Sequence, residues 1–239
     1  METAAVNILK RAVDMDEKKR YTEALVCYQE GIQLLIDAMK SFNDTEKKQH
    51  FRSKIESYMG RAEALKRHVD DEKTRGVYHE QIVIEHNSTG HSYQSVFGRF
   101  LDSDVTQVVV EDPYIRHFHQ CQNLLRLCEL LVKSCSDLKT IRLLTTEDTS
   151  CDQAQSLKKL QSELSSRWKI SLVVQFSPTL HDRQIKLSNG WIIKIGRGLD
   201  YFKPPESKFS VGNYDLDLRP CYETTVDVFH EKDVRMTNS

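Results

Sequence analysis

The chain has 239 residues, 39% of them hydrophobic and 29% charged, with a formal net charge of -1, which suits one large or two small folded domains and argues against extensive disorder. This balanced charge excludes a globally basic nucleic-acid binder, so an anionic partner has to be met by a local patch. No apolar run approaches the roughly 20 residues that span a bilayer, and the N-terminus lacks the apolar block of a signal peptide, so we expect a cytoplasmic protein with peripheral membrane contact.

The first 70 residues contain no proline, and their apolar residues recur at helical spacing. This pattern predicts three helices, at about 2–19, 21–40 and 46–70. The break before the third helix offers Asn43, Asp44 and Thr45 as N-cap residues.

The second and third predicted helices together predict a peptide groove. The core stripe of the third helix consists of Phe51, Ile55, Tyr58, Ala62, Leu65 and Val69. At about 100° per residue, Met59 falls at the edge of this stripe and Glu63 lies one turn further on. On the second helix Ala24, Gly31 and Ala38 repeat every seven residues, and such small residues let another helix approach closely. We expect a groove with an apolar floor and an acidic rim, suited to an amphipathic helix that carries Leu and Arg; alternatively, Met59 fills the core and Glu63 is simply solvated.

Residues 21–40, YTEALVCYQEGIQLLIDAMK, and 54–69, KIESYMGRAEALKRHV, resemble the MIT (microtubule-interacting and trafficking) domain family. The resemblance covers residues 3–70 and implies binding of the helical C-terminal tails of ESCRT-III subunits between helices two and three. It also implies that Met59 is the key pocket residue and Glu63 its acidic partner. A second family mode, which uses the groove of helices one and three or an extended peptide, stays open. The predicted peptide-binding residues are Met59, Glu63, Ala62, Lys66, Gly31 and Ala38.

Beyond a charged stretch that contains Gly76, the pattern changes to short alternating apolar runs. We predict strands in QIVIEH, VTQVVVED, LKTIRLLTT, ISLVVQFS and the hairpin IKLSNGWIIKIG, and helices in FHQCQNLLRLCELLVKS and AQSLKKLQSELSSRW. Strands that alternate with helices favour crossovers and a mixed sheet. We therefore expect an all-α three-helix bundle at 1–72, a linker at 73–80 and an α/β domain at 81–239. In the hairpin, Asn189-Gly190 suits a type I′ turn that would bring Lys186 and Lys194 together.

The six cysteines include no CxxC pair and fit a reducing compartment. Cys121, Cys128 and Cys135 repeat every seven residues on one helix face. A metal site with His117 and His119 is conceivable, but buried free thiols are ordinary on an amphipathic helix. No metal or other cofactor is predicted.

Residues 179–202, TLHDRQIKLSNGWIIKIGRGLDYF, raise the question of phosphodiester cleavage. A phospholipase-D-type site needs a histidine nucleophile, a second histidine as general acid, and lysines on the phosphoryl oxygens. Its signature is HxK, four residues, then Asp, and it is needed twice. Here Arg183 replaces the Lys, Ser188 replaces the Asp, and no second copy exists. We predict that the protein is not an enzyme; the alternative is a dimeric phosphodiesterase that uses His181 from each subunit.

The same region is locally basic. Residues 181–208 include six Lys or Arg residues and only three acidic residues, with aromatic residues among them. Basic residues mixed with aromatic ones suit an anionic membrane surface or single-stranded nucleic acid, although a solvated sheet face explains Lys186 and Lys194 as well. The predicted membrane- or phosphate-binding residues are His181, Arg183, Lys186, Lys194, Arg197 and Lys203.

With EDPYIRHFHQ and LDLRPCYETTVDVF, the C-terminal region resembles the second domain of a small family in which an MIT domain precedes a phospholipase-D-like domain. The resemblance implies a non-catalytic domain that binds acidic phospholipids such as phosphoinositides and forms a homodimer. It also implies work with ESCRT-III in abscission during cytokinesis, at the midbody and on late endosomes. No nucleic-acid partner is expected.

Overall fold

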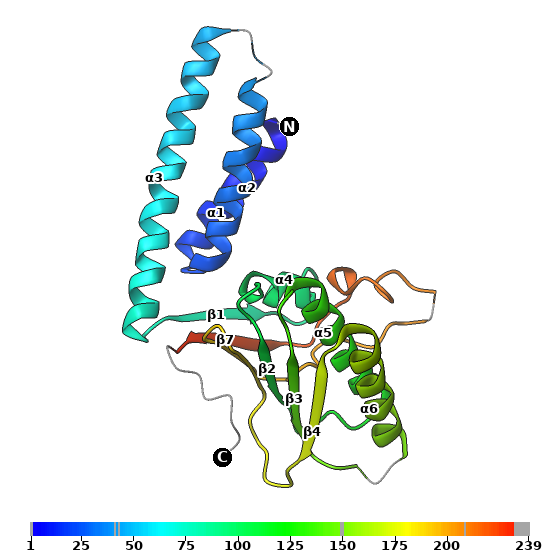
Figure 1. Cartoon of the computed structure of the whole chain (residues 1–239). Helices are drawn as coiled ribbons and strands as arrows, with labels where there is room; N and C mark the ends of the chain where they lie inside the picture. The colour runs from blue at the N-terminus through cyan, green and yellow to red at the C-terminus, as the bar shows by residue number, and fades with distance from the viewer. Residues whose placement is uncertain (1, 41, 43, 149–150, 208, 232–239) are drawn as a thin grey trace. The chain divides into compact units, whose positions relative to one another are not determined.

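The computed structural model describes residues 2–40, 42, 44–148, 151–207 and 209–231. By its internal contacts the chain divides into two compact units, Met1–Glu80 and Gln81–Ser239. Figure 1 shows a helical first unit and a second unit of strands and helices. The predicted fold class, a three-helix bundle followed by an α/β domain with a mixed sheet, is confirmed. Among the described residues, no helix combines the length and apolar character needed to cross a bilayer.

The first unit consists of α1 (Glu2–Glu17), α2 (Tyr21–Lys40) and α3 (Thr45–Arg75). Asp44 is the N-cap of α3, and its side chain accepts from the backbone N–H of Glu46 at 2.9 Å. Asn43 lies outside the described residues. The helix runs five residues beyond its predicted end because DDEKTR contains no helix breaker, and it stops at Gly76, where φ is 68°.

The longer α3 extends into the segment that was predicted to be a linker. Residues 73–75 belong to α3 and residues 79–80 belong to β1, so only the middle of the 73–80 segment is irregular. The charged stretch suggested a linker, but charged residues such as Glu, Lys and Arg are also good helix formers.

The second unit contains a seven-stranded sheet in the order β1-β7-β6-β5-β2-β3-β4. The strands are β1 (His79–Ile84), β2 (Gln107–Glu111), β3 (Thr140–Thr145), β4 (Ser171–Phe176), β5 (Gln184–Leu187), β6 (Trp191–Ile195) and β7 (Thr224–His230). β2, β3 and β4 run parallel, whereas β2–β5, β5–β6 and β6–β7 are antiparallel. β7 has no counterpart in the sequence prediction.

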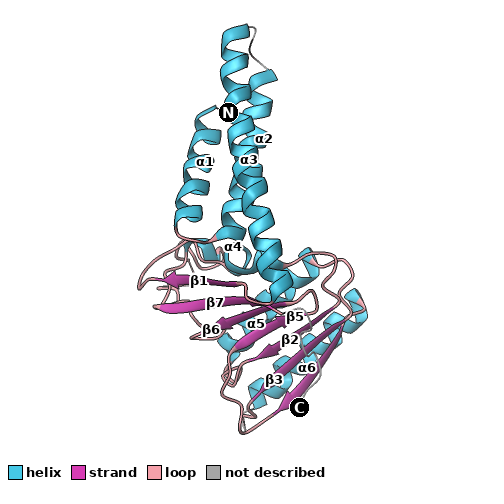
Figure 2. Cartoon of the chain, turned by 90° about the vertical axis from the view of Figure 1, so that its left-hand side faces the viewer, coloured by secondary structure: helices cyan, strands magenta, loops and turns pink. Residues whose placement is uncertain are grey.

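Two helices cross between the parallel strands and cover one face of the sheet (Figure 2). α5 (Phe118–Ser134) matches its predicted segment, and α6 (Cys151–Glu163) continues as a π-helical turn, Leu164–Trp168. Along β3 every second residue is buried, as expected for a strand with one covered face. The short helix α4 (Tyr93–Phe97) was not predicted.

The β5–β6 hairpin differs from its prediction. The N–H of Gly190 donates to the carbonyl of Leu187 at 3.1 Å, and Gly190 has a φ of 101° while Asn189 has no positive φ. The turn is therefore not type I′, because that type needs positive φ at both central residues. In the resulting register Lys194 lies opposite Gln184, and Lys186 lies opposite Ile192, so the two lysines are not a direct pair.

Candidate functional site

A cavity of about 390 Å³ lies between α2 and α3 in the first unit. Met59 is 44% exposed at its edge, so the thioether is open to a visiting side chain. The lining residues are Leu25, Gln29, Ile32, Gln33, Met59, Ala62, Glu63 and Lys66. Four of the six predicted peptide-binding residues thus meet at one groove, together with two apolar and two amide side chains from α2.

Gly31 and Ala38 do not line this groove. A Cβ on Gly31 would lie 2.6 Å from Cγ of Leu9, so Gly31 faces α1. Ala24, in the same row, is fully buried, and Ala38 is nearly so. The small residues therefore belong to the interior of the bundle, where those at 24 and 31 leave room for α1 rather than for a guest helix.

The charges around the groove are more balanced than predicted. Its lining carries one carboxylate, Glu63, and one ammonium, Lys66, both exposed. Gln33 donates to Asp37 at 3.1 Å, and Lys40 pairs with the same carboxylate at 2.8 Å. The predicted acidic rim is thus a single carboxylate among the lining residues.

A second cavity of the bundle, of about 280 Å³, lies between α1 and α3. Its lining residues are Val6, Leu9, Lys10, Leu35, His50, Phe51, Lys54 and Tyr58. Two lysines make this cavity basic, in contrast to the α2/α3 groove. The two grooves therefore suit guests of different charge.

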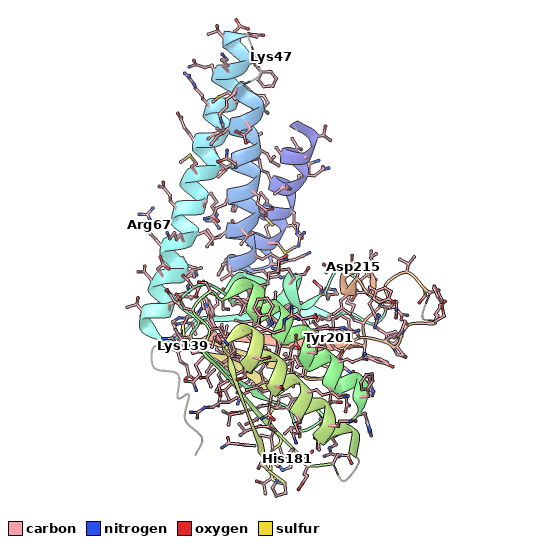
Figure 3. The ribbon with its side chains drawn as sticks, turned by 45° about the vertical axis from the view of Figure 1, so that its right-hand side comes forward. Lys47, Arg67, Lys139, His181, Tyr201 and Asp215 are labelled. Atoms are coloured by element: carbon pink, nitrogen blue, oxygen red, sulfur yellow. The ribbon has the colours of Figure 1, made fainter. Side chains whose placement is uncertain are left out.

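His181, the predicted nucleophile equivalent, lies on the exposed loop between β4 and β5 (Figure 3). No described residue forms a hydrogen bond or ion pair with its side chain. Arg183, two residues on, donates to the carbonyl of Gly196 at 2.6 Å and lies 4.3 Å from the ring centroid of Tyr114. Arg183 thus connects the His181 loop to the Gly196 loop.

The remaining predicted cations divide between two places. Lys186 pairs with Glu111 at 2.8 Å on the sheet, so its charge is balanced, while Lys194 is exposed beside the ring of Phe229. Arg197 and Lys203 both lie over the ring of Tyr222, at 4.5 and 5.5 Å from its centroid. The structure therefore brings Arg197 and Lys203 together.

The GRGLD segment is held by a buried carboxylate. Asp112 accepts from the backbone N–H groups of Tyr114 and Leu199, each at 3.0 Å, and its burial raises the pKa of its carboxyl group. A Cβ on Gly198 would lie 2.1 Å from Oδ2 of Asp112, and Gly198 has a φ of 63°. The second glycine of this segment is therefore required by packing and backbone conformation.

A cavity of about 800 Å³, which was not expected from the sequence, lies between the start of α5 and the 200–222 segment. Its lining residues are Phe118, His119, Gln122, Asn123, Arg126, Asp200, Phe202, Lys203, Pro204, Pro205, Asn213, Tyr214, Arg219 and Tyr222. Lys203 is the single predicted site residue among them. One signal was present in the sequence: His119, Asn123 and Arg126 recur at helical spacing as a polar stripe on α5.

The cysteine row lies in the core of the second unit. Cys121, Cys128 and Cys135 are buried free thiols, and burial raises the pKa of Cys128 to about 12 and of Cys135 to about 11. Among the described residues no group of three His, Cys, Asp or Glu side chains has the arrangement of a metal site.

We expect the buried thiols to be unreactive in the folded chain. The side chain of Cys151 lies outside the described part, so a Cys151→Ser background isolates the five buried ones, Cys27, Cys121, Cys128, Cys135 and Cys221. Titration with a thiol reagent at about pH 8 should label them only after denaturation, because neutral, inaccessible thiols do not attack. Rapid native labelling of Cys128 would contradict this assignment.

Comparison with known proteins agrees with both units. Residues 2–67 match the family described as "MIT (microtubule interacting and transport) domain", and residues 90–230 match "Phospholipase D-like domain at C-terminus of MIT". The chain is also similar to mouse (Mus musculus) "MIT domain-containing protein 1". The identity is 51% over 233 residues, which cover 96% of this chain and 93% of the mouse protein.

Proposed function

This chain belongs to the family in which an MIT domain precedes a phospholipase D-like domain, and from that premise we propose that it is an ESCRT-III-binding adaptor. Its α2/α3 groove binds the helical C-terminal tails of ESCRT-III subunits, and its second domain binds acidic membrane. The observation that carries the proposal is the exposed thioether of Met59 in an apolar groove whose rim bears Glu63.

The groove supports recognition of an amphipathic helix. Leu25, Ile32 and Ala62 supply an apolar floor on which the leucines of a tail helix can pack. Met59 is unbranched and adaptable, so it can fill the space between those leucines. Glu63 offers a carboxylate to an arginine of the tail, in a charge-assisted hydrogen bond that sets orientation.

The second domain offers exposed cations to an anionic surface. Lys194 and Arg197 are exposed, and Arg197 and Lys203 gather around Tyr222. Each near-surface Lys or Arg contributes about 1 kcal/mol to binding of an anionic membrane. His181 and Arg183 lie on the loop that leads into β5, and Arg183 contacts Gly196, next to Arg197. We include both among the residues that face the membrane.

We propose that the domain is not a phosphodiesterase. His181 has no orienting carboxylate among the described residues, and the guanidinium of Arg183 is engaged by the Gly196 carbonyl. A histidine is a poor catalytic nucleophile when no carboxylate orients its ring and no second histidine serves as the general acid. The rival, a dimer that supplies His181 from each subunit, predicts turnover of a phosphodiester that His181→Ala abolishes.

The cellular setting follows from the same proposal. We infer a cytoplasmic homodimer that acts peripherally on membranes, at the midbody in abscission during cytokinesis and on late endosomes. Two linked subunits present two grooves and two membrane faces, so weak contacts gain from high effective concentration. We place the two domains at residues 1–72 and 81–239.

A bridging experiment tests the adaptor directly. Beads that carry an ESCRT-III tail peptide should capture acidic vesicles when the full chain is added, and should not capture zwitterionic ones. Capture should fall with added salt, because the membrane contact is electrostatic. If the chain binds the beads but brings no acidic vesicles, the membrane half of the proposal is wrong; if it does not bind the beads, the peptide half is wrong.

A further inference from the structure

The 800 Å³ cavity of the second unit contains two guanidinium groups without a carboxylate partner. Arg219 is only 5% exposed, and it donates to the backbone carbonyls of Gly212 and Asn213. Burial and the nearby charge of Arg126 both lower the pKa of Arg219. No ion pair joins either arginine to a carboxylate among the described residues. A buried cation without a counter-ion is costly, and an anion in the cavity would relieve that cost.

The one carboxylate of the cavity lining is already engaged. Asp200 accepts from the amide of Asn123 at 3.0 Å and lies 3.3 Å from Nε2 of His119. Arg126 donates to the side-chain oxygen, Oδ1, of the same Asn123 at 2.8 Å. The lining therefore holds three permanent cations, Arg126, Lys203 and Arg219, against one carboxylate. Its charge favours a group with more than one negative charge.

Two exposed apolar side chains, Phe118 and Tyr214, line this cavity, and two more lie a few residues before Tyr214 in the chain. Phe209 is 101%, Tyr214 89% and Val211 84% exposed, and Phe118 projects from the start of α5. Figure 1 shows the segment that carries the first three, in orange, standing away from the sheet and helices of its unit, and Figure 3 labels Asp215 within it. Phe118 and Tyr214 also line the cavity.

These side chains fit a lipid bilayer better than a protein partner. Phe209, Val211 and Tyr214 lie on a segment of turns and bends outside any helix or strand, and each is almost fully exposed, so they do not pack into a continuous surface. Aromatic side chains prefer the interfacial region of a bilayer, where the phosphates of the lipids also lie. If such side chains enter a bilayer, a cation-lined cavity beside them comes to the depth of those phosphates.

Arg219 links the cavity to the apolar segment. Its guanidinium donates to the carbonyls of Gly212 and Asn213, which lie between Val211 and Tyr214. Gly212 has a φ of 84°, and a Cβ there would lie 2.8 Å from the carbonyl of Leu218, so the segment returns tightly on itself. The backbone between Val211 and Tyr214 is thus held in place before binding, which lowers the entropy cost of inserting these two side chains.

We propose that this cavity binds the phosphate of an anionic lipid headgroup, while Phe209, Val211 and Tyr214 enter the bilayer. The inference rests on the membrane-binding half of the proposed function and gives it a site centred on Arg126 and Arg219. Two guanidinium groups favour a terminal phosphate, which carries more charge and more free oxygens than a phosphodiester.

Vesicle co-sedimentation of the full chain tests the cavity. The vesicles contain phosphatidylcholine with either phosphatidic acid or phosphatidylserine at matched total charge. We expect the parent to prefer phosphatidic acid, and Arg126→Gln to bind it about tenfold more weakly and to lose the preference. Arg167→Gln, which removes the same charge from an exposed residue of the π-helical turn, should bind like the parent.

The outcomes separate this inference from the function on which it rests. If the parent binds acidic vesicles and Arg126→Gln binds them equally well, the cavity assignment is wrong and membrane binding stands. If the parent binds no acidic vesicles, both fail. Thermal unfolding of each variant, compared with that of the parent, confirms that Arg126→Gln is folded.

Two further measurements decide between lipid phosphate and free phosphate. Phe209→Trp should be quenched by brominated lipids in phosphatidic acid vesicles more than the parent, and Phe209→Ser should bind these vesicles several-fold more weakly. Glycerol 3-phosphate should compete only at concentrations far above that of the lipid. Strong competition by this soluble phosphate, together with no quenching at position 209, would overturn the lipid assignment.

Discussion

Met59→Asp should weaken the binding of helical ESCRT-III tail peptides about 100-fold. Met59 is 44% exposed at the edge of the α2/α3 cavity, so a leucine of the tail would cover the new carboxylate. Burying an unpaired carboxylate against apolar atoms costs about 3 kcal/mol even after partial hydration, and each 1.4 kcal/mol is about a factor of ten in affinity. Fluorescence anisotropy of labelled tail peptides with the full chain measures the change.

Val6→Asp is the matched control for this experiment. Val6 is 41% exposed and lines the α1/α3 cavity, so the variant places the same charge at similar exposure in the other groove. We expect it to bind like the parent. The reverse pattern, with loss at Val6 and none at Met59, would move the guest to the α1/α3 cavity. Equal binding by all three chains would leave neither groove with a role.

Helical angles alone were enough to predict which residues of α3 lie together. Met59, Ala62, Glu63 and Lys66 fall on one side of α3 whatever packs against it, and the structure places them in one cavity. Gly31 failed for a different reason. Its helical angle was correctly read as a row of small residues, but the sequence does not say which neighbour lies over that row, and the neighbour is Leu9 of α1.

In the second domain the sequence predicted local elements better than the pairing between them. The segment 118–134 is helical as predicted, and the strands from β1 to β6 lie where their apolar runs predict. The partner of Lys186 is Glu111, which strand pairing brings close from a remote part of the chain. The sequence of the hairpin alone does not indicate that Lys186 pairs with Glu111.

The cavity was missed for the same reason. Arg126 lies on α5 and Arg219 follows the 3-10 turn Leu216–Leu218, so no window of sequence contains both. The basic segment on which the prediction of a membrane- or phosphate-binding site was based, residues 181–208, contributes Lys203 to the cavity lining. Local charge density therefore pointed to the second domain, whereas the placement of the charges required its fold.

Gly198→Ala should destabilise the second domain by about 3 kcal/mol. A residue other than glycine at positive φ costs about 1 kcal/mol, and displacing the buried carboxylate of Asp112, 2.1 Å from the new Cβ, adds about 2 kcal/mol of overpacking. For a domain of this size the midpoint of thermal unfolding should fall by roughly 10 °C. Both tryptophans, Trp168 and Trp191, lie in this domain, so their fluorescence follows its unfolding alone.

Gly90→Ala separates the two contributions. Gly90 also has positive φ, 83°, but a Cβ there meets no atom within 4 Å, so this variant should lose only about 1 kcal/mol. Equal losses in the two variants would mean that the Asp112 contact is unimportant. If Gly198→Ala costs more, the same displacement shifts the loop that ends at Asp200, in the wall of the Arg126–Arg219 cavity. Because that wall positions the cations, the folded fraction of Gly198→Ala should also bind phosphatidic acid vesicles more weakly than Gly90→Ala does.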